Sequence, residues 1–405
     1  PVPAFAGSPQ ALDPLLAVGV TIVQRGFPAT FNFANEDFRE LAAGCDERGM
    51  LLVASGLTHH ELNLADPDLY QDFQTWAERY YGRHANHPSI VMYGLGINAP
   101  GNFNDFSPAK LGRSENLIWS NPSITRSYLT GRRVDPTRLY YYHGGPCGGD
   151  VASGNFYPNH TPIQEVEDWM LDWSEKGDRL FFTVEGLLST FNVDYEKGGV
   201  TYITEYAARL IGDPAYGYET DKYREYISFR RPRLGTWALN VNYYPQLDAL
   251  RSEALLRGGR AWRFLGLPFN HWAGNIGVGS PSPDNSAFQG AAAQLRLPTM
   301  AWIGGPENEF SLKDHNFYAG ETVEKTLLGI YDQPVGDALW EARWELREKA
   351  SGKVAAEGRL SRKMSPYSRA KAPFRFRLPD AAAPVEYDLN LTVRDAAAGR
   401  PVAED

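Results

Sequence analysis

Cysteine is scarce in this sequence, since Cys45 and Cys147 are the only two among 405 residues. Two cysteines cannot build a disulfide framework, and their wide separation fits no zinc-binding spacing. We therefore expect two buried free thiols.

Long apolar runs and an excess of positive charge are also missing. No apolar run approaches the roughly 18 residues that suggest a membrane-spanning helix. The formal net charge of −9 argues against a nucleic-acid partner, because phosphate binding needs clustered Lys and Arg. No Gly-rich loop with dinucleotide or phosphate spacing follows a predicted strand, so we expect no cofactor. A homo-oligomer stays open.

The opening segment, PVPAFAGSPQ, carries neither an initiator Met nor a signal-peptide pattern. We expect that residues preceding Pro1 have been removed, so this segment by itself indicates no compartment.

Aromatic residues, in contrast, are abundant, with 10 Trp, 22 Tyr and 20 Phe. Sugar rings have apolar faces that stack on such side chains, but aromatic residues also fill protein cores. Composition alone leaves both interpretations open.

Short apolar runs alternate with amphipathic stretches over the first two thirds of the chain. The runs are continuous rather than alternating, which is typical of strands buried on both faces. They cover Val20–Gln24, Met50–Ser55, Ile90–Leu95, Leu139–Gly144, Gly154–Tyr157, Leu180–Gly186 and Ala261–Phe269. Repeated βα units predict an α/β fold with a parallel sheet, here a (β/α)₈ TIM barrel over residues 1–314. Its first strand either lies upstream of Pro1 or is disguised in the first ten residues.

After about His315 the pattern changes to strict alternation. In LWEARWELR, Trp340 and Trp344 fall on one face and Glu341 and Arg343 on the other. Period-two strands with one polar face predict an antiparallel, immunoglobulin-like β-sandwich over residues 315–405.

Polar residues follow the predicted barrel strands at the edge where active sites of such barrels lie. They are His59, His60 and Glu61 after the third strand, Asn98 after the fourth, His143 after the fifth, Asn155 and Tyr157 in the sixth, Glu185 in the seventh, and Asn270, His271 and Trp272 in the eighth. Because six strands contribute, packing alone explains this set poorly, and we expect a site there.

Two other kinds of site fit less well. A metal centre is disfavoured because His59 and His60 are adjacent, so their side chains would diverge on a strand, and no H-x-H or H-E-x-x-H occurs. A Ser-His-Asp hydrolase is disfavoured because there is no G-x-S-x-G sequence.

Five segments, in this order, carry a family resemblance: FRELAAGCDERGMLLVAS, HPSIVMYGLG, DPTRLYYYHGG, GNFYPNHTPIQEVEDW and RLFFTVEG. They resemble the clan of retaining (β/α)₈ glycoside hydrolases, most closely the family 2 β-galactosidase and β-glucuronidase group. The resemblance spans roughly Val20 to Trp272, and the family commonly appends immunoglobulin-like domains.

The resemblance implies roles for particular residues. Glu185 matches the nucleophile, which forms a glycosyl-enzyme intermediate. Tyr157 matches a tyrosine that hydrogen-bonds the nucleophile, and Trp272 matches a platform for the sugar. Asn155, His60, Glu61, Asp105 and His271 complete the expected substrate-binding set.

The sequence departs from the family where the acid/base glutamate belongs. Counted from Tyr93, which replaces the family's Trp, that position is Asn98, preceded by Ile97; a shift of one residue puts it on Ala99. The glutamate after the fifth strand is His143 here. An amide cannot donate a proton to a leaving oxygen, and general acid catalysis typically contributes about 10²–10⁴-fold.

Three explanations stay open. Glu61, Asp105 or His143 supplies the proton; the chain carries an engineered Glu-to-Asn substitution, although Ile97 then also departs from the pattern; or the protein binds glycans without cleaving them. We favour the first, a glycoside hydrolase acting on a β-linked oligo- or polysaccharide. The family resemblance implies cleavage from the chain end (exo action), β-galactosidase-like activity, and a secreted or periplasmic location. The alternative is a glycan-binding pseudo-glycosidase.

Overall fold

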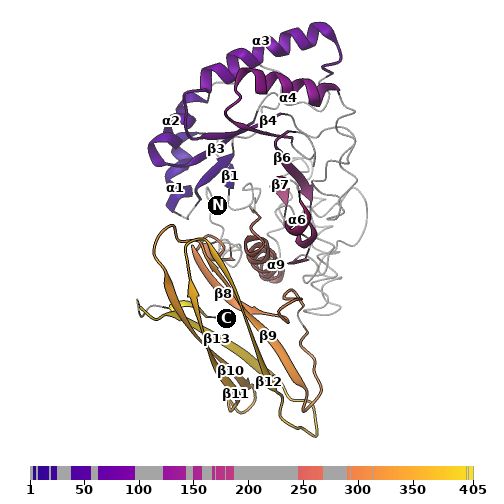
Figure 1. Ribbon diagram of the computed structural model, residues 1–405, viewed down its shortest axis with the longest axis vertical. Coiled ribbons are helices and arrows are strands. Elements are labelled where there is room, and N and C mark those ends of the chain that lie inside the picture. Colours follow the sequence, from indigo (N-terminus) through magenta and orange to yellow (C-terminus); the bar gives the residue numbers. More distant parts are fainter. Residues whose placement is uncertain are drawn as a thin grey trace, which may run out of the picture. The chain divides into compact units, whose positions relative to one another are not determined.

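The chain divides into two compact units, residues 1–296 and residues 297–405 (Figure 1). The computed structural model describes residues 3–5, 8–17, 20–24, 38–55, 63–95, 122–142, 149–156, 167–168, 170–177, 179–186, 245–267, 290–291, 293–312, 314–397, 399 and 401–404. Among these residues, no helix is long and apolar enough to cross a membrane.

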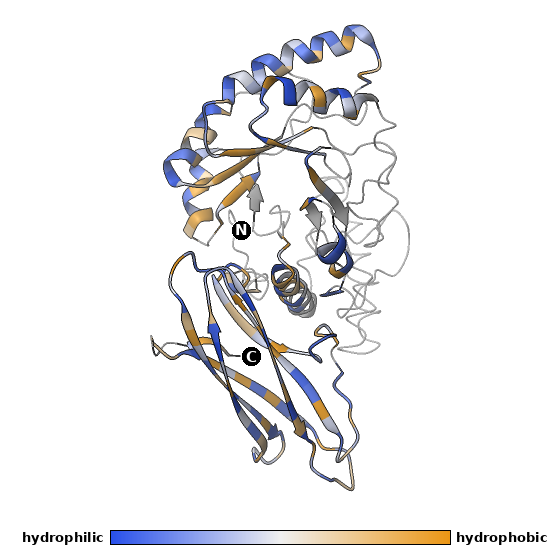
Figure 2. Ribbon diagram, in the orientation of Figure 1, coloured by the Kyte–Doolittle hydropathy of each residue, from blue (hydrophilic) through white to orange (hydrophobic). Residues whose placement is uncertain are grey.

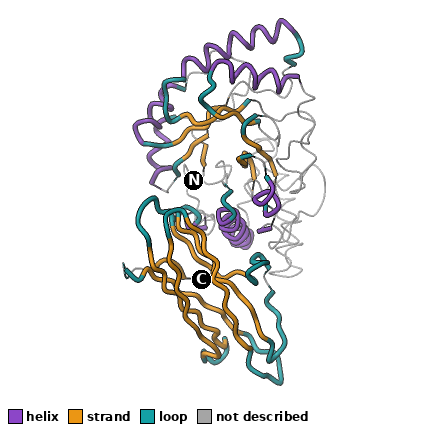
Figure 3. Tube along the Cα trace, in the orientation of Figure 1, coloured by secondary structure: helices purple, strands orange, loops and turns teal. Residues whose placement is uncertain are grey.

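The first unit is built on a seven-stranded parallel sheet whose strands follow one another in chain order. They are β1 (Pro3–Phe5), β2 (Ile22–Gln24), β3 (Leu51–Ser55), β4 (Ile90–Gly94), β5 (Leu139–Tyr141), β6 (Val151–Phe156) and β7 (Leu180–Gly186). The sheet curls, as Figure 3 shows. Sequential parallel strands confirm the predicted α/β class. Closure into a complete (β/α)₈ barrel stays a prediction, because the described residues include no further strand of this sheet after β7.

The first strand of the sheet lies within the first ten residues, which is one of the two positions that the sequence left open. β1 pairs in parallel with β2, with Pro3 opposite Ile22 and Phe5 opposite Gln24. Its three residues are too few to show a periodic pattern, which explains why the sequence concealed it.

Two layers of buried side chains flank the sheet. One layer lies on the concave face and takes one residue from each strand from β2 to β7: Ile22, Val53, Met92, Tyr141, Val151 and Phe182. The other layer joins the convex face to the helices α1 (Leu12–Ala17), α2 (Arg39–Arg48), α3 (Pro67–His84) and α4 (Pro122–Val134). Because both faces are buried, the strands read as the continuous apolar runs seen in the sequence (Figure 2).

Helix α3 illustrates how local sequence sets an element. Asp66 accepts hydrogen bonds from the backbone N–H groups of Asp68 and Leu69, and Pro67 follows at the first helical position. Phe73, Trp76, Tyr80 and His84 recur at helical spacing and are all buried. Residues 67–84 thus confirm, for this stretch, the amphipathic segments that the sequence predicts between the apolar runs.

The predicted last barrel strand, Ala261–Phe269, is wrong for its described part. Residues 245–264 form one helix, α9 (Pro245–Phe264), which buries Ala261 and Trp262. The helix ends at Phe264, and Gly266, two residues later, has φ +78°. The Gly266 and Leu267 amides donate to the carbonyls of Arg263 and Trp262, closing a Schellman motif. A short apolar run does not distinguish a strand from a buried helix turn, and here it belongs to a helix.

The second unit is an antiparallel β-sandwich. One sheet has the order β11-β10-β13-β14 and the other β12-β9-β8. The strands are β8 (Thr299–Gly304), β9 (Thr322–Tyr331), β10 (Ala338–Glu348), β11 (Val354–Met364), β12 (Ser368–Arg377), β13 (Tyr387–Asp395) and β14 (Pro401–Glu404).

The alternation read from the sequence is confirmed in β10. Trp340, Ala342 and Trp344 are buried in the core between the sheets, whereas Glu341 and Arg343 are exposed. Figure 2 shows the same alternation of apolar and polar residues along neighbouring strands. The more specific immunoglobulin-like assignment stays a prediction.

The boundary between the units lies earlier than the predicted 314/315. Strand β8 pairs with β9 from Thr299 opposite Tyr331 to Gly304 opposite Thr326, so it belongs to the sandwich. Its sequence, TMAWIG, is continuously apolar, because its described side chains are largely buried. It therefore lacks the alternation by which the other sandwich strands could be recognised.

Candidate active site

The carboxyl ends of parallel strands form the edge at which sites of such folds are built. Of the ten residues to which we assigned a catalytic or binding role, the structure describes the backbone of two, Asn155 in β6 and Glu185 in β7. The other eight lie outside the described residues: His60, Glu61, Asn98, Asp105, His143, Tyr157, His271 and Trp272.

Asn155 and Glu185 are brought together. They are Cα partners in the parallel pairing of β6 with β7, next to the carboxyl end of both strands. The register shifts between Gly154 and Asn155, because Gly154 is opposite Thr183 while Asn155 is opposite Glu185. One extra residue of β7, Val184, is thus accommodated. Such bulges bend a strand and re-aim the residues that follow, and they are frequent beside active sites.

A buried hydrogen bond crosses the concave face of the sheet near the same edge. The side-chain amide of Gln24, the last residue of β2, donates to the Tyr141 hydroxyl of β5 over 2.8 Å. Gln24 is 1% and Tyr141 0% exposed. Sequence reasoning missed both residues. The available signal was a polar residue closing the apolar run VTIV.

Glycine at position 94 makes room for the Tyr141 ring. A Cβ atom on Gly94 would lie 3.0 Å from the Tyr141 hydroxyl oxygen and 3.1 Å from Cζ. Both are tighter than ordinary van der Waals contact. Gly94 ends β4, four residues before Asn98. The strand that leads to the altered acid/base position is therefore in contact with the Gln24–Tyr141 pair.

The tyrosines on either side of Tyr141 belong to the convex face. Tyr140 and Tyr142 are buried in the layer between sheet and helices, together with Tyr93 of β4. Burial raises the pKa of all three phenols, so they stay protonated at neutral pH. Tyr93, which takes the place of the family's Trp, packs edge-on against Tyr81 with ring centroids 4.6 Å apart. Its described contacts are those of a core residue.

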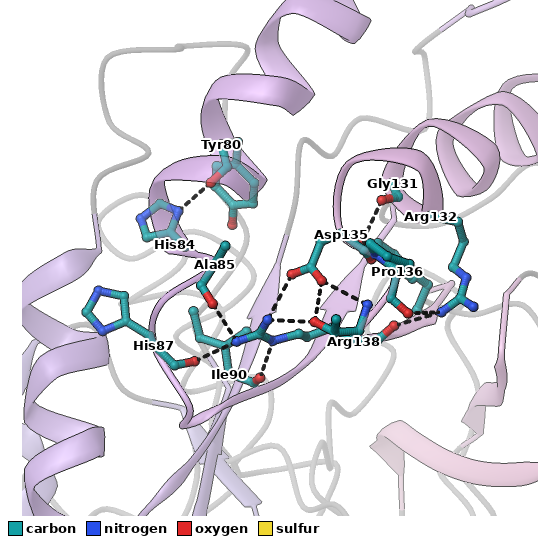
Figure 4. Close-up of polar contacts among 12 residues, drawn as sticks. Tyr80, His84, Ala85, His87, Ile90, Gly131, Arg132, Asp135, Pro136 and Arg138 are labelled. Carbon is teal, nitrogen blue, oxygen red and sulfur yellow. Dashed lines mark hydrogen bonds and ion pairs between the residues drawn. The ribbon is translucent and has the colours of Figure 1, made fainter.

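Two of the segments behind the family resemblance act at the opposite, amino-terminal edge. In DPTR, the Arg138 guanidinium donates to the carbonyl oxygens of Ala85, His87 and Ile90 and to the Asp135 carboxylate (Figure 4). In HPSI, the Asp46 carboxylate of α2 accepts a hydrogen bond from the Ser89 amide and contacts His87 Nδ1. These motifs thus hold strands in place and lie away from the candidate site, as expected for that edge of a barrel.

Metal ligation finds no support among the described residues, which contain no cluster of three or more His, Cys, Asp or Glu side chains that could hold an ion. Cys45 is buried, and burial raises the pKa of its thiol to about 11. A thiol of that kind is neither a good ligand nor a good nucleophile at neutral pH.

Comparison with known proteins gives a structural likeness only. No family model and no curated protein matches the sequence. A β-D-mannosidase from Dictyoglomus thermophilum superposes with a TM-score of 0.55 at 13% identity, over 98% of this chain and 46% of the mannosidase.

Two further solved structures match less well. An exo-chitosanase from Amycolatopsis orientalis has a TM-score of 0.48 at 11% identity, over 98% of this chain and 45% of its own. An FMN-binding β-glucuronidase from Facaelibacterium prausnitzii has a TM-score of 0.41 at 14% identity, over 100% and 54%. The chain spans about half the length of these structures, from 45% to 54%. The mannosidase match shows that the chain has a fold found in a β-glycoside hydrolase.

Proposed function

We propose that this chain is a β-glycoside hydrolase in which Glu185 is the nucleophile and the proton comes from a group other than the usual glutamate. The observation that carries the proposal is the position of Glu185, beside Asn155 at the carboxyl ends of two neighbouring parallel strands. The fold shared with a β-D-mannosidase supports it.

The chemistry follows from a carboxylate at that place. Glu185 would attack the anomeric carbon, break the bond to the leaving oxygen and form a covalent glycosyl-enzyme. Water then releases the sugar with its configuration retained. Tyr157, two residues beyond Asn155, would donate a hydrogen bond to the Glu185 carboxylate, while His60, His271 and Trp272 would bind the sugar.

Departure of the leaving group is the step that the sequence leaves incomplete. Asn98 holds no proton to donate, so we propose Glu61, Asp105 or His143 in its place. Substrates would be oligo- or polysaccharides cleaved from the end, outside the cytoplasm. A β-galactoside is the expected sugar from the family resemblance.

The decisive experiment uses aryl β-glycosides whose leaving groups need no protonation. We expect turnover of at least one among 2,4-dinitrophenyl β-galactoside, β-mannoside, β-glucuronide and β-glucosaminide. Glu185→Gln should lower that rate at least a thousandfold, because the neutral amide cannot form the intermediate. Glu175→Gln, an exposed glutamate on α6 (Leu171–Lys176), is the matched control and should retain wild-type rate.

A second panel with poor leaving groups identifies the donor. With phenyl glycosides, loss of the true donor among Glu61→Gln, Asp105→Asn and His143→Asn should lower the rate far more than with dinitrophenyl glycosides. Absence of turnover on every activated substrate, together with measurable sugar binding, would contradict hydrolysis. That result would favour the alternative, a glycan-binding protein without hydrolytic activity. The missing acid/base glutamate is the observation that supports this alternative.

A further inference from the structure

We propose that Gln24 and Tyr141 are a positioning pair, which holds the carboxyl ends of β2, β4 and β5 together beneath the active site. The proposal deepens the hydrolase function and rests on it for its catalytic readout. Neither residue needs to touch the sugar. Both are buried, and they would act through the segments that follow their strands.

The hydrogen bond joins strands that are not neighbours. In the sheet order, β3 and β4 lie between β2 and β5. Neighbouring strands are about 4.8 Å apart, so β2 and β5 are separated by roughly 14 Å along the sheet. On a flat sheet the Gln24 and Tyr141 side chains would project in parallel and miss one another. The 2.8 Å bond therefore forms across the curved interior.

The bond also holds the intervening strand β4 at a definite place. The Tyr141 ring covers Gly94, where a Cβ atom would lie 3.0 Å from the hydroxyl oxygen and 3.1 Å from Cζ. A shift of β4 towards the interior would drive its backbone into the ring. A shift of Tyr141 away from β4 would break the bond to Gln24. Three strand ends are thus coupled through one phenol.

The coupled strand ends lead directly to residues of the proposed site. Asn98 follows Gly94 by four residues, and His143 follows Tyr141 by two. Productive geometry of catalytic groups must be held within a few tenths of an ångström. Loosening the pair should therefore misplace these groups without unfolding the unit.

Strand β5 supplies its own control. Tyr140 is equally buried but lies on the convex face, and its hydroxyl donates to the carbonyl oxygens of Gly131 and Asp135. Tyr140→Phe and Tyr141→Phe each remove one buried hydroxyl from adjacent positions of the same strand. One change affects the helix side of the sheet, the other the site side.

The test compares these two variants, with Gln24→Met as a second way to break the pair. With the activated substrate that wild type turns over, we expect Tyr141→Phe and Gln24→Met each to lower kcat at least tenfold with KM changed less than threefold. The double variant should lose less than the two single effects combined, because both substitutions remove the Gln24–Tyr141 bond. Tyr140→Phe should stay within twofold of wild-type kcat, although its melting temperature falls.

Hydrogen exchange gives a readout that is independent of catalysis. In Tyr141→Phe and Gln24→Met, amides directly after β2, β4 and β5 should exchange faster than in wild type. In Tyr140→Phe the increase should instead fall on α4 and the turn after it. Equal effects of the two tyrosine variants on kcat, or unchanged exchange after β4 in Tyr141→Phe, would overturn the proposal.

The two failures are distinguishable. If wild type turns over no glycoside, the hydrolase function fails, and the exchange pattern alone decides about the pair. If wild type and Glu185→Gln behave as expected while Tyr141→Phe keeps full kcat, the function stands and the positioning role fails. Should Tyr141→Phe not fold, Gln24→Met carries the comparison.

Discussion

Asp46, a residue of helix α2, joins that helix to the loop that precedes β4. Its carboxylate accepts a hydrogen bond from the Ser89 amide at 2.8 Å and contacts His87 Nδ1 at 2.7 Å. Ser89 in turn donates from its hydroxyl to the Ala42 carbonyl of the same helix. One side chain of α2 thus holds the loop that starts β4, which leads to the altered acid/base position.

This arrangement predicts a pH-dependent loss of stability. Burial alone would raise the pKa of Asp46, but the bonds from Ser89 and His87 outweigh it and lower the pKa. A carboxyl whose pKa is lowered by folding stabilises the protein above its unfolded-state pKa, about 3.9, and loses that contribution as pH falls through the folded-state pKa. Asp46→Asn should lower the free energy of unfolding at pH 7 by about 1–3 kcal/mol, with the gap to wild type narrowing below about pH 4.

Urea unfolding between pH 3 and pH 8 measures this difference. Asp72→Asn, which changes an exposed carboxylate on α3, should show almost no effect across the same range. A gap for Asp46→Asn that stays constant down to pH 3 would mean that shape, and not charge, makes the residue important.

The end of α9 shows that the apolar run starting at Ala261 belongs to a helix and not to a strand, which sequence periodicity leaves open. Gly266 has φ +78°, and among the described residues, its chain neighbours aside, no atom lies within 4 Å of where its Cβ would be. Replacing it by alanine therefore costs only backbone strain, roughly 1–2 kcal/mol for a left-handed residue with a Cβ. We expect Gly266→Ala to destabilise the first unit by about that amount.

Gly82 is the matched control with the opposite sign. It lies inside α3, also with open space at its Cβ, but with ordinary helical backbone. Gly82→Ala should stabilise the protein by about 0.5–1 kcal/mol, because alanine loses less chain entropy in a helix. Denaturant midpoints at constant slope measure both changes. If Gly266→Ala were also neutral or stabilising, the end of α9 would not be the left-handed turn described.

The elements that sequence alone predicts best are those with a repeated pattern. In helix α3 and strand β10, apolar residues repeat many times at the spacing of a helix or a strand. A single residue that breaks the pattern therefore does not prevent their recognition. β1, with three residues, and Ala261–Phe269, with an apolar run too short to show a period, could not be assigned in this way.

For the site, sequence order predicts which residues end neighbouring strands but not how distant strands meet. Asn155 and Glu185 follow consecutive runs, so their approach could be expected. The register shift that aligns them could not, because a bulge depends on backbone pairing. The Gln24–Tyr141 bond joins residues 117 positions apart and exists only because the sheet curls.

For the chain as a whole, the position of the unit boundary has a physical consequence. Strand β8 contributes Ala301 to the core between the two sheets and covers one edge of β9. Cutting the chain after residue 314 removes Ala301 from this core and leaves the β9 edge unpaired. Exposed edges of that kind favour aggregation.

We therefore predict that residues 297–405 fold by themselves, whereas residues 315–405 do not. The longer fragment should unfold cooperatively on heating and show dispersed amide resonances in a two-dimensional NMR spectrum. The shorter fragment should lack both features or aggregate, because it loses a whole strand of one sheet and exposes the edge of β9. A domain of this size has only about 5–15 kcal/mol of stability in total. Cooperative unfolding of residues 315–405 would move the boundary back to the position that alternation alone suggests.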